Sequence, residues 1–194
     1  IVAKGLDFAN VGLVGIISAD ISLNIPDFRS AEKTFQLITQ AAGRAGRGEE
    51  RGHVIVQTYS PEHYAVTAAA AHDYEAFYRT EIKMRKLLGY PPYADMMQIV
   101  VSSAEESDAQ AGADLTEALL RCALGDREAL NLMGNRPAPI GKASGRYRYH
   151  MILKCPNGKR PLYTSFIDAV QRQIIADKKN KFNIYVDINP YSFM

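Results

Sequence analysis

Apolar residues in the first part of the chain form two short runs with a helical pattern between them. The runs at residues 11–17 (VGLVGII) and 53–59 (HVIVQTY) are rich in β-branched residues, which predicts two parallel strands buried on both faces. Ser30 is the predicted N-cap of a helix over residues 31–42. The apolar positions of this helix share one side: Ala31, Phe35, Ile38 and Ala42. Strand, helix and strand in this order predict an α/β domain.

Two helical patterns follow, at residues 62–72 and 73–88. An apolar stripe in the second of them is expected to face a core: Tyr74, Phe77, Tyr78 and Ile82. Gly89, followed closely by Pro91 and Pro92, is a strong signal for the end of a helix. We therefore expect a domain boundary here, with one domain over residues 1–92 and a second over residues 93–194.

The remaining pattern alternates between strand and helix periods. Strands are predicted at 96–102, 130–134, 147–155 and 182–188, and helices at 105–124 and 162–178. The resulting order, βαββαβ, is that of a ferredoxin-like α+β domain.

Composition restricts the protein classes that remain. The chain is 47% hydrophobic and 23% charged, as soluble globular proteins are. It contains no run of eighteen apolar residues, so no membrane span and no membrane partner is expected. The first residues have no signal-peptide pattern, which predicts a cytoplasmic protein, and a chain that starts with Ile1 is expected to be a piece of a longer one. Cys122 and Cys155 have no CxxC spacing, so reduced thiols are expected and a metal site is not.

Charge is distributed unevenly along the chain. Residues 1–139 carry 13 Lys and Arg against 18 Asp and Glu, whereas residues 140–194 carry 10 against 3. A basic terminal segment predicts an acidic partner, most commonly nucleic acid, although a solvated basic face that binds nothing is an alternative.

The stretch TQAAGRAGRGEERG, at residues 39–52, carries candidate chemistry. On a helix that continues to Arg47, a single stripe of hydrogen-bond donors would form from Gln36, Gln40, Arg44 and Arg47. A solvated helix end with a flexible loop is the alternative. The spacing Gln40-x-x-Gly43-Arg44-x-x-Arg47 resembles motif VI (QxxGRxxR) of superfamily 2 helicases. Upstream, KGLDF at residues 4–8 resembles motif V, which contains a GxD.

The segments around these motifs are similar to one helicase family over essentially the whole chain. They read LVGIISAD, then VIVQTYSPEHYA, EAFYRTEIKMRKLLGYPPY and finally GRYRYHMILK with VDINP. They resemble the PriA (primosomal protein N′) family of replication-restart helicases. RecG-type and other repair helicases share motifs V and VI but not the segments that follow them.

The resemblance implies a fold and a function. The fold would be part of a RecA-like second helicase lobe, followed by the ferredoxin-like domain. The longer parent would be an ATP-dependent DNA helicase that recognises stalled or branched replication forks and promotes primosome assembly and replication restart.

The resemblance also implies roles for motif residues. Gln40, Arg44 and Arg47 would face ATP across a cleft between two lobes, with Arg47 as the arginine finger on the γ-phosphate and Arg44 contacting phosphate or organising the finger. Gly43 would allow close approach to the nucleotide. The motif V residues would connect the nucleotide state to the grip on DNA: Gly5 and Asp7, with Lys4 on the DNA backbone or simply on the surface.

The chain departs from the family pattern in what it lacks. It contains no GxxxxGK[ST] and no DExx sequence, so the phosphate loop and the Mg²⁺ carboxylates are missing. The first lobe that would share ATP and Mg²⁺, and the cysteine-rich insertion that would bind zinc in the parent, are expected before residue 1. This chain alone is therefore expected neither to hydrolyse ATP nor to unwind DNA.

The basic tail alternates cationic and aromatic residues at 145–150 (GRYRYH). On a strand, Arg146, Arg148 and His150 would form one face, and Tyr147 and Tyr149 the other. That face could contact phosphates, with a ring free for base stacking, or the tyrosines could lie in the core and the arginines in water. Two further candidates for DNA contact lie nearby in sequence: Lys142 and Lys154.

The resemblance implies partners for this tail. They are branched and single-stranded DNA, other primosome proteins, and the acidic tail of single-stranded DNA-binding protein, with Lys159 and Arg160 as candidates for the last contact. Two other functions stay open. The chain could be a non-enzymatic nucleic-acid-binding module in which GRAGRG is a basic loop, or an RNA helicase fragment, which leaves the basic tail unexplained.

Overall fold

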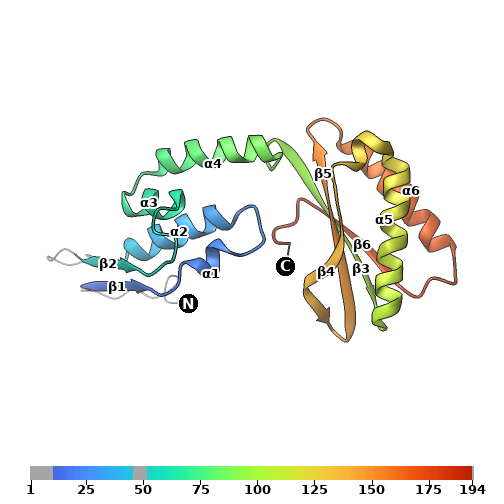
Figure 1. Ribbon diagram of the computed structural model, residues 1–194, viewed down its shortest axis with the longest axis horizontal. Coiled ribbons are helices and arrows are strands. Elements are labelled where there is room, and N and C mark those ends of the chain that lie inside the picture. Colours follow the sequence, from blue (N-terminus) through green and yellow to red (C-terminus); the bar gives the residue numbers. More distant parts are fainter. Residues whose placement is uncertain (1–10, 46–51, 194) are drawn as a thin grey trace. The chain divides into compact units, whose positions relative to one another are not determined.

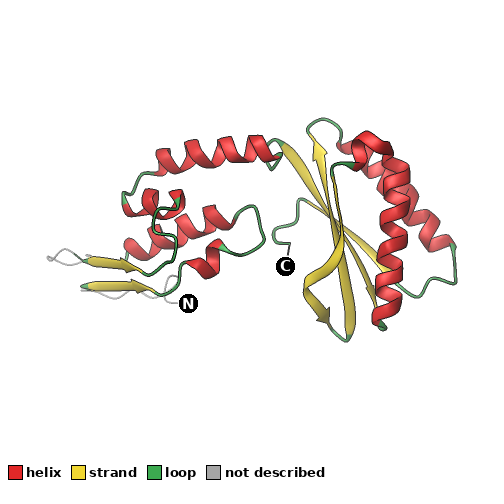
Figure 2. Cartoon of the chain, viewed as in Figure 1, coloured by secondary structure: helices red, strands yellow, loops and turns green. Residues whose placement is uncertain are grey.

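The chain divides into two compact units, Ile1–Met84 and Arg85–Met194. A computed structural model describes residues 11–45 and 52–193 and contains helices and strands in both units, with two separate sheets (Figures 1 and 2). The predicted mixture of helices and sheets is thus confirmed. The division lies within a helix that precedes Pro92, and the predicted domain boundary after Pro92 stays a prediction, because compactness alone does not show that a unit folds independently.

The first unit is a small α/β arrangement. Strands β1 (Leu13–Ile16) and β2 (His53–Val56) pair in parallel, as predicted, with Leu13 opposite His53. Four helices accompany them: α1 (Asp20–Leu23), α2 (Ser30–Ala42), α3 (Tyr64–Ala70) and α4 (Tyr74–Leu88), the last of which continues past Met84.

The expectation that both strands are buried on two faces was wrong. Their residues alternate between exposed and half-buried, and the exposed side carries Leu13 and Ile55, which are 60% and 61% exposed. A strand points alternate side chains to opposite faces, so helix α2, which contacts both strands, covers only one set.

The start of α2 also differs from the prediction. Ser30 is the first helical residue rather than the cap, and Arg29 occupies the N-cap position. The preceding turn is held by the carboxylate of Asp27, which accepts a hydrogen bond from the Arg29 backbone N–H at 2.8 Å and lies 3.2 Å from the Lys33 ammonium. The Asp27 carboxylate therefore holds the turn before the helix, and no described side chain caps the first helical turn itself.

Packing in this unit depends on two aromatic rings. Phe35 of α2 stacks on Phe77 of α4, with ring centroids 4.4 Å apart. The buried residues of α4 are Phe77 and Glu81, whereas Tyr74 and Tyr78 of the predicted stripe are exposed. Glu81 is buried because it accepts a 2.6 Å hydrogen bond from the Tyr64 hydroxyl, a pairing that an apolar pattern cannot reveal.

The second unit follows the predicted βαββαβ order. Its elements are β3 (Ala94–Ser103), α5 (Glu106–Ala129), β4 (Leu132–Ala143), β5 (Arg146–Pro156), α6 (Arg160–Ala176) and β6 (Asn183–Ile188). The strands form one antiparallel sheet in the order β4-β5-β3-β6. Helices α5 and α6 cover the same face of it (Figure 1), whereas the opposite face is reached by the C-terminal residues, since the Gln98 amide donates a hydrogen bond to the Phe193 carbonyl at 3.3 Å. We call this second face the open face.

Two local features shape this sheet. Strand β4 is longer than predicted and passes through Pro137 and Pro139, with register irregularities on both sides of the Arg136–Pro137 pairs. It turns into β5 through Ser144 and Gly145, both with positive φ, as a two-residue hairpin requires.

Candidate functional site

The predicted site residues that the structure describes lie in three places, and the first is the end of helix α2. The helix ends at Ala42, and hydrogen-bonded turns continue it, with the Arg44 N–H donating to the Ala41 carbonyl at 3.0 Å. Gln36 and Gln40 are exposed on the side away from the buried Phe35, and Arg44 is half-exposed after them. The predicted stripe of polar donors is therefore present as far as Arg44.

The backbone conformation at Gly43 does not require a glycine. Its φ is −64°, and a Cβ there would meet only two backbone oxygens at 3.6 and 3.7 Å, which is ordinary contact. Among the described residues, nothing else lies within 4 Å of this Cβ position. The other residues of motifs V and VI lie outside the described part of the chain: Lys4, Gly5, Asp7 and Arg47.

The second place is the open face of the four-stranded sheet. Even-numbered residues of β5 point to this face, and odd-numbered ones, such as Met151 and Leu153, lie in the core beneath α5 and α6. Arg146, Arg148 and His150 are therefore on one face, as predicted.

The tyrosines resolve the alternative that the sequence left open. Tyr149 is buried in the core, and Tyr147 packs against its edge. The odd positions that carry both tyrosines face the helices, which favours the alternative with the tyrosines in the core for Tyr149, whereas Tyr147 is half-buried. The Lys142 ammonium lies over the Tyr147 ring, 4.2 Å from its centroid.

His150 is the buried centre of the open face. It is 3% exposed, and burial together with the positive charges of Arg136 and Arg148 lowers its pKa to about 4. The ring is thus neutral at pH 7. Arg136 donates through Nε to His150 Nε2 at 3.2 Å, and the Gln98 amide nitrogen Nε2, which also donates to the Phe193 carbonyl, lies 3.2 Å from His150 Nδ1.

The arginines on the open face are held to different degrees. Arg146 donates to the backbone carbonyl of Ser102 at 2.8 Å and to its hydroxyl at 3.3 Å, so part of its donor capacity is used inside the sheet. Arg148 is half-buried, and no described residue forms an ion pair or hydrogen bond with its side chain. Arg136, on β4, is exposed and is oriented by its bond to His150.

Lys154 differs from the other predicted DNA contacts. Its ammonium donates to the Leu88 carbonyl at 2.8 Å and lies 4.1 Å from the centroid of the Tyr90 ring. Burial lowers the pKa of this group. The geometry therefore supports a role in holding the end of α4 and leaves less of the charge for an external phosphate.

The two candidates for partner contact lie at the start of α6. Lys159 forms an ion pair with Glu128 at 2.6 Å, and Arg160 makes two hydrogen bonds to Asp95, at 2.7 and 2.9 Å. The bond to Arg160 is the main reason that the pKa of Asp95 is lowered. Both cations are exposed, but each already has an acidic partner.

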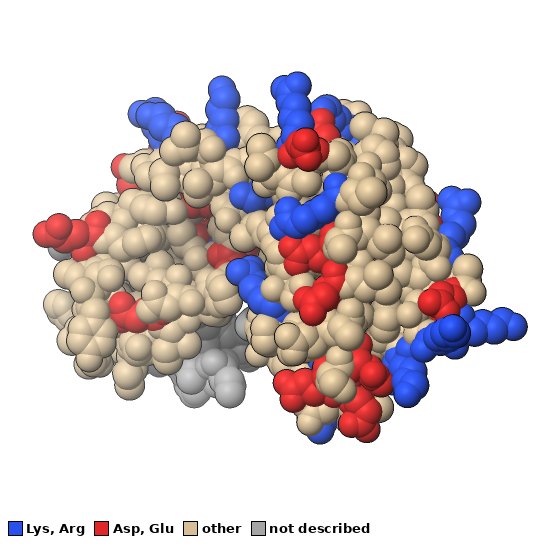
Figure 3. Space-filling view, turned by 45° about the vertical axis from the view of Figure 1, so that its right-hand side comes forward, with Lys and Arg blue, Asp and Glu red and all other residues tan. Residues whose placement is uncertain are grey.

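Basic side chains do not form one continuous area on the surface shown in Figure 3, where groups of Lys and Arg alternate with groups of Asp and Glu. The local arrangement around His150 is therefore more informative than the net charge of the tail. Sequence reasoning missed Arg136, because the predicted strand ended at residue 134, whereas β4 continues to Ala143.

No cluster of three or more potential metal ligands occurs among the described residues. Cys122 is exposed and Cys155 is buried, and neither forms a disulfide. No helix in the described ranges is long and apolar enough to cross a membrane.

Comparison with known proteins connects these features to one family. A family model described as Primosomal protein N C-terminal domain matches residues 86–191. The replication restart protein PriA of Bacillus subtilis is 42% identical over 195 residues, covering 100% of this chain and 24% of that protein. Proteins of the same name from Synechocystis and Treponema pallidum are 41% and 33% identical, over 79% and 100% of this chain and 18% and 28% of their own lengths. The chain thus spans about a quarter of the length of these curated relatives.

Proposed function

The chain belongs to the PriA family, and we propose that it contributes two parts of a replication-restart DNA helicase: one side of an ATP site and a DNA-binding domain. The longer protein would recognise stalled or branched forks and promote primosome assembly in the cytoplasm. The first unit would belong to the second RecA-like lobe, for which parallel pairing of β1 and β2 around α2 is supporting evidence. The second unit would be ferredoxin-like, which its βαββαβ order and antiparallel strand order support.

The observation that carries the DNA-binding proposal is the arrangement of Arg136 and Arg148 beside a neutral His150. The two guanidinium groups offer forked donors to phosphate, and His150 adds no charge of its own and fixes the orientation of Arg136. Arg146 and Lys142 would extend this contact along the hairpin, and Lys154 would contribute least because of its bond to Leu88.

A binding experiment with forked DNA tests this proposal. The double variant Arg136→Ala/Arg148→Ala should bind more weakly and should lower the slope of log K against log salt by about 1.5, the loss of two phosphate contacts. Fluorescence anisotropy at several salt concentrations measures both quantities. The matched control is Arg127→Ala/Arg172→Ala, which removes the same charge from exposed positions on α5 and α6. Equal slopes in the two double variants would reject the open face as the contact.

The proposal for the ATP site depends on the end of α2. The Gln40 amide and the Arg44 guanidinium, with the small Gly43 between them, suit the oxygens of a phosphate chain. Bound ATP would supply the γ-phosphoryl group, and Arg47 would neutralise the charge that develops on it, an effect worth roughly 10³–10⁵ in rate for arginine fingers in general. We assign Mg²⁺ and the phosphate loop to the other lobe, and zinc to a segment of the parent outside this chain.

ATPase measurements separate these roles. The 194-residue chain should show no steady-state turnover with forked DNA, and Arg47→Ala in the full-length protein should abolish turnover. Turnover that survives Arg47→Ala would refute the role assigned to motif VI.

Partner binding would use the start of α6. An acidic tail such as that of single-stranded DNA-binding protein would have to share or displace the contacts of Lys159 with Glu128 and of Arg160 with Asp95. Weakening one acid with Glu128→Gln should therefore strengthen binding of an acidic peptide by a few-fold, whereas removing Lys159 should weaken it. Titration calorimetry distinguishes the two directions.

A further inference from the structure

The two edges of the four-stranded sheet differ in how they are protected. Edge strands expose unpaired backbone groups, and proteins usually blunt them with prolines or bulges. Strand β4, one edge, contains Pro137 and Pro139 and has two register irregularities. Strand β6, the other edge, pairs with β3 without any shift and contains neither proline nor lysine within Asn183–Ile188. Only β6 therefore offers a regular ladder of free donors and acceptors.

The positions of these free groups follow from the register. The Asn189 N–H donates to the Met96 carbonyl, which makes their pair a hydrogen-bonded one. Hydrogen-bonded pairs recur at every second residue of an antiparallel ladder, so the pair of Tyr185 and Val100 is hydrogen-bonded as well. The residues between these pairs, Ile184 and Val186, direct their N–H and C=O groups away from β3.

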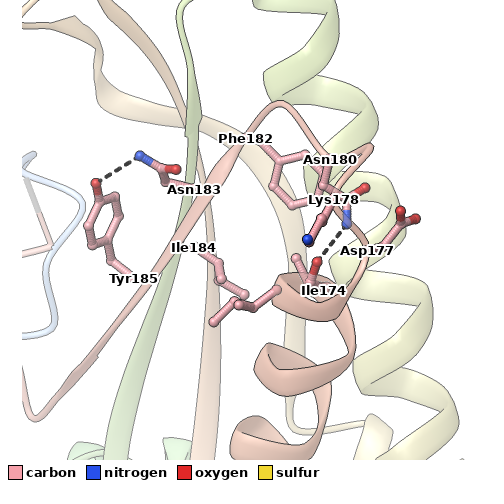
Figure 4. A pocket seen from close by; sticks show the side chains of 9 residues that line it. Ile174, Asp177, Lys178, Asn180, Phe182, Asn183, Ile184 and Tyr185 are labelled. Atoms are coloured by element: carbon pink, nitrogen blue, oxygen red, sulfur yellow. Dashed lines mark hydrogen bonds between the residues drawn. The ribbon is translucent and has the colours of Figure 1, made fainter.

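A cavity of about 360 Å³ opens beside this edge (Figure 4). It is lined by Phe182, just before β6, and by the first residues of β6 up to Tyr185. The side chains of these strand residues alternate between the two faces of the sheet, so the cavity lies along the strand edge. Its apolar wall includes Ile174 of α6, and the Asn180 amide caps α6 by donating to the Ile174 carbonyl at 2.8 Å. Ile175 on the rim is 71% exposed.

Charged side chains of opposite sign lie at the two ends of β6. Three lysines lie at the end where β6 begins: Lys178, Lys179 and Lys181. None of their ammonium groups is held in an ion pair by a described residue, and the one acid beside them, Asp177, already accepts a hydrogen bond from the Lys179 N–H. The other end of β6 carries the exposed Asp187.

From these observations we propose that β6 is a docking edge for an extended peptide of a partner protein. The peptide adds as a fifth strand, places one large apolar side chain in the cavity between β6 and α6, and carries a carboxylate at the lysine end and no acid near Asp187. The site lies at the end of α6, whereas Lys159 and Arg160 lie at its beginning, so it is distinct from the partner contact proposed above.

An eight-residue, end-blocked peptide serves as the probe. Threonine alternates with valine in it, with one central phenylalanine, a lysine near the amino end and a glutamate near the carboxyl end, as antiparallel addition to β6 requires. The control peptide has the lysine and glutamate exchanged and the same composition. Both are titrated into the ¹⁵N-labelled 194-residue chain, with amide shifts and hydrogen exchange followed by NMR.

We expect saturable shifts confined to residues 174–188, with a Kd below about 1 mM for the probe and at least fivefold weaker binding of the control. The Ile184 and Val186 amides should exchange quickly in the free chain and slowly with the probe, while the Tyr185 amide should be protected in both. Val186→Pro, which removes an outward N–H, should abolish binding, and Val186→Ala should retain it.

Other outcomes would overturn the proposal. They are equal binding of the two peptides, shifts centred on Arg146 and Arg148, and unchanged exchange at Ile184 and Val186 with bound peptide. Protection of these two amides that rises with protein concentration in the absence of peptide would instead identify a second copy of the chain as the occupant. The exchange pattern needs no variant, so the test stands even if Val186→Pro fails to fold.

Discussion

Lowering the pH should destabilise the second unit through one side chain, His150. The pKa of this ring is lowered to about 4 in the folded state from 6.5 in the unfolded state. As the pH falls below 6.5, the unfolded chain takes up a proton that the folded chain refuses, so stability is complete above this value and is lost as the pH approaches 4. At about 1.4 kcal/mol per pKa unit, the loss from His150 alone should reach about 2.5 kcal/mol at pH 4.5.

The matched variant is His150→Gln, which does not titrate and retains an acceptor for Arg136 Nε. Urea unfolding at pH 7.5 and pH 4.5 should be followed by the methyl NMR signal of Met151, because this residue is fully buried in the core of the second unit and reports on that unit alone. The pH-dependent loss of stability should be about 2.5 kcal/mol larger in the native chain than in the variant.

Acidic groups do not confuse the comparison. Asp95, Glu117 and Glu128 also have lowered pKa values, so their stabilisation is lost at still lower pH, and it is the same in both proteins. Equal pH dependence in the native chain and in His150→Gln would refute the reasoning, as would a ring of His150 that titrates near pH 6.5.

Two further predictions concern packing and hydrogen bonding. Gly112→Ala should destabilise the second unit by about 1–3 kcal/mol, because the new Cβ would lie 2.5 Å from the Phe182 ring. Thermal unfolding should show a smaller loss of stability when Gly112→Ala is made in a chain that already carries Phe182→Ala. Tyr163→Phe should lower the free energy of unfolding by about 1–3 kcal/mol, because the buried hydroxyl donates a hydrogen bond to Glu128 at 2.6 Å. In the native chain, the tyrosinate absorbance of Tyr163 should appear only near its raised pKa of about 12.

The order and the ends of the elements were predictable where the sequence carries a single strong signal, such as a β-branched run or a glycine. Parallel pairing of β1 and β2 follows from two β-branched runs on either side of a helix, and the end of α4 at Leu88 follows from Gly89, whose φ is +61°. The break that Gly125 introduces in α5 coincides with the predicted helix end at Leu124, because a glycine at φ +73° interrupts the helical backbone.

The site was predictable in part. Alternation placed Arg148 and His150 on one face of β5, since a strand has a period of two. The lowered pKa of His150 was not predictable, because it depends on burial that only the folded sheet creates and on the charge of Arg136 from another strand. The ion pairs of Lys159 and Arg160 were missed for the same reason: Glu128 and Asp95 are 31 and 65 residues away along the chain.

The position of β3 in the sheet has a consequence for biosynthesis. This strand is translated first in its unit, yet its neighbours in the sheet are β5 and β6, and its partner for Met97 is Ile188. Contacts this distant in sequence form slowly, because a long loop must close before they contribute any stability. During translation, the apolar segment of β3 (MMQIVV) therefore stays unpaired until almost the whole unit has left the ribosome. We expect it to be the segment of this unit that most needs protection by a chaperone during that interval.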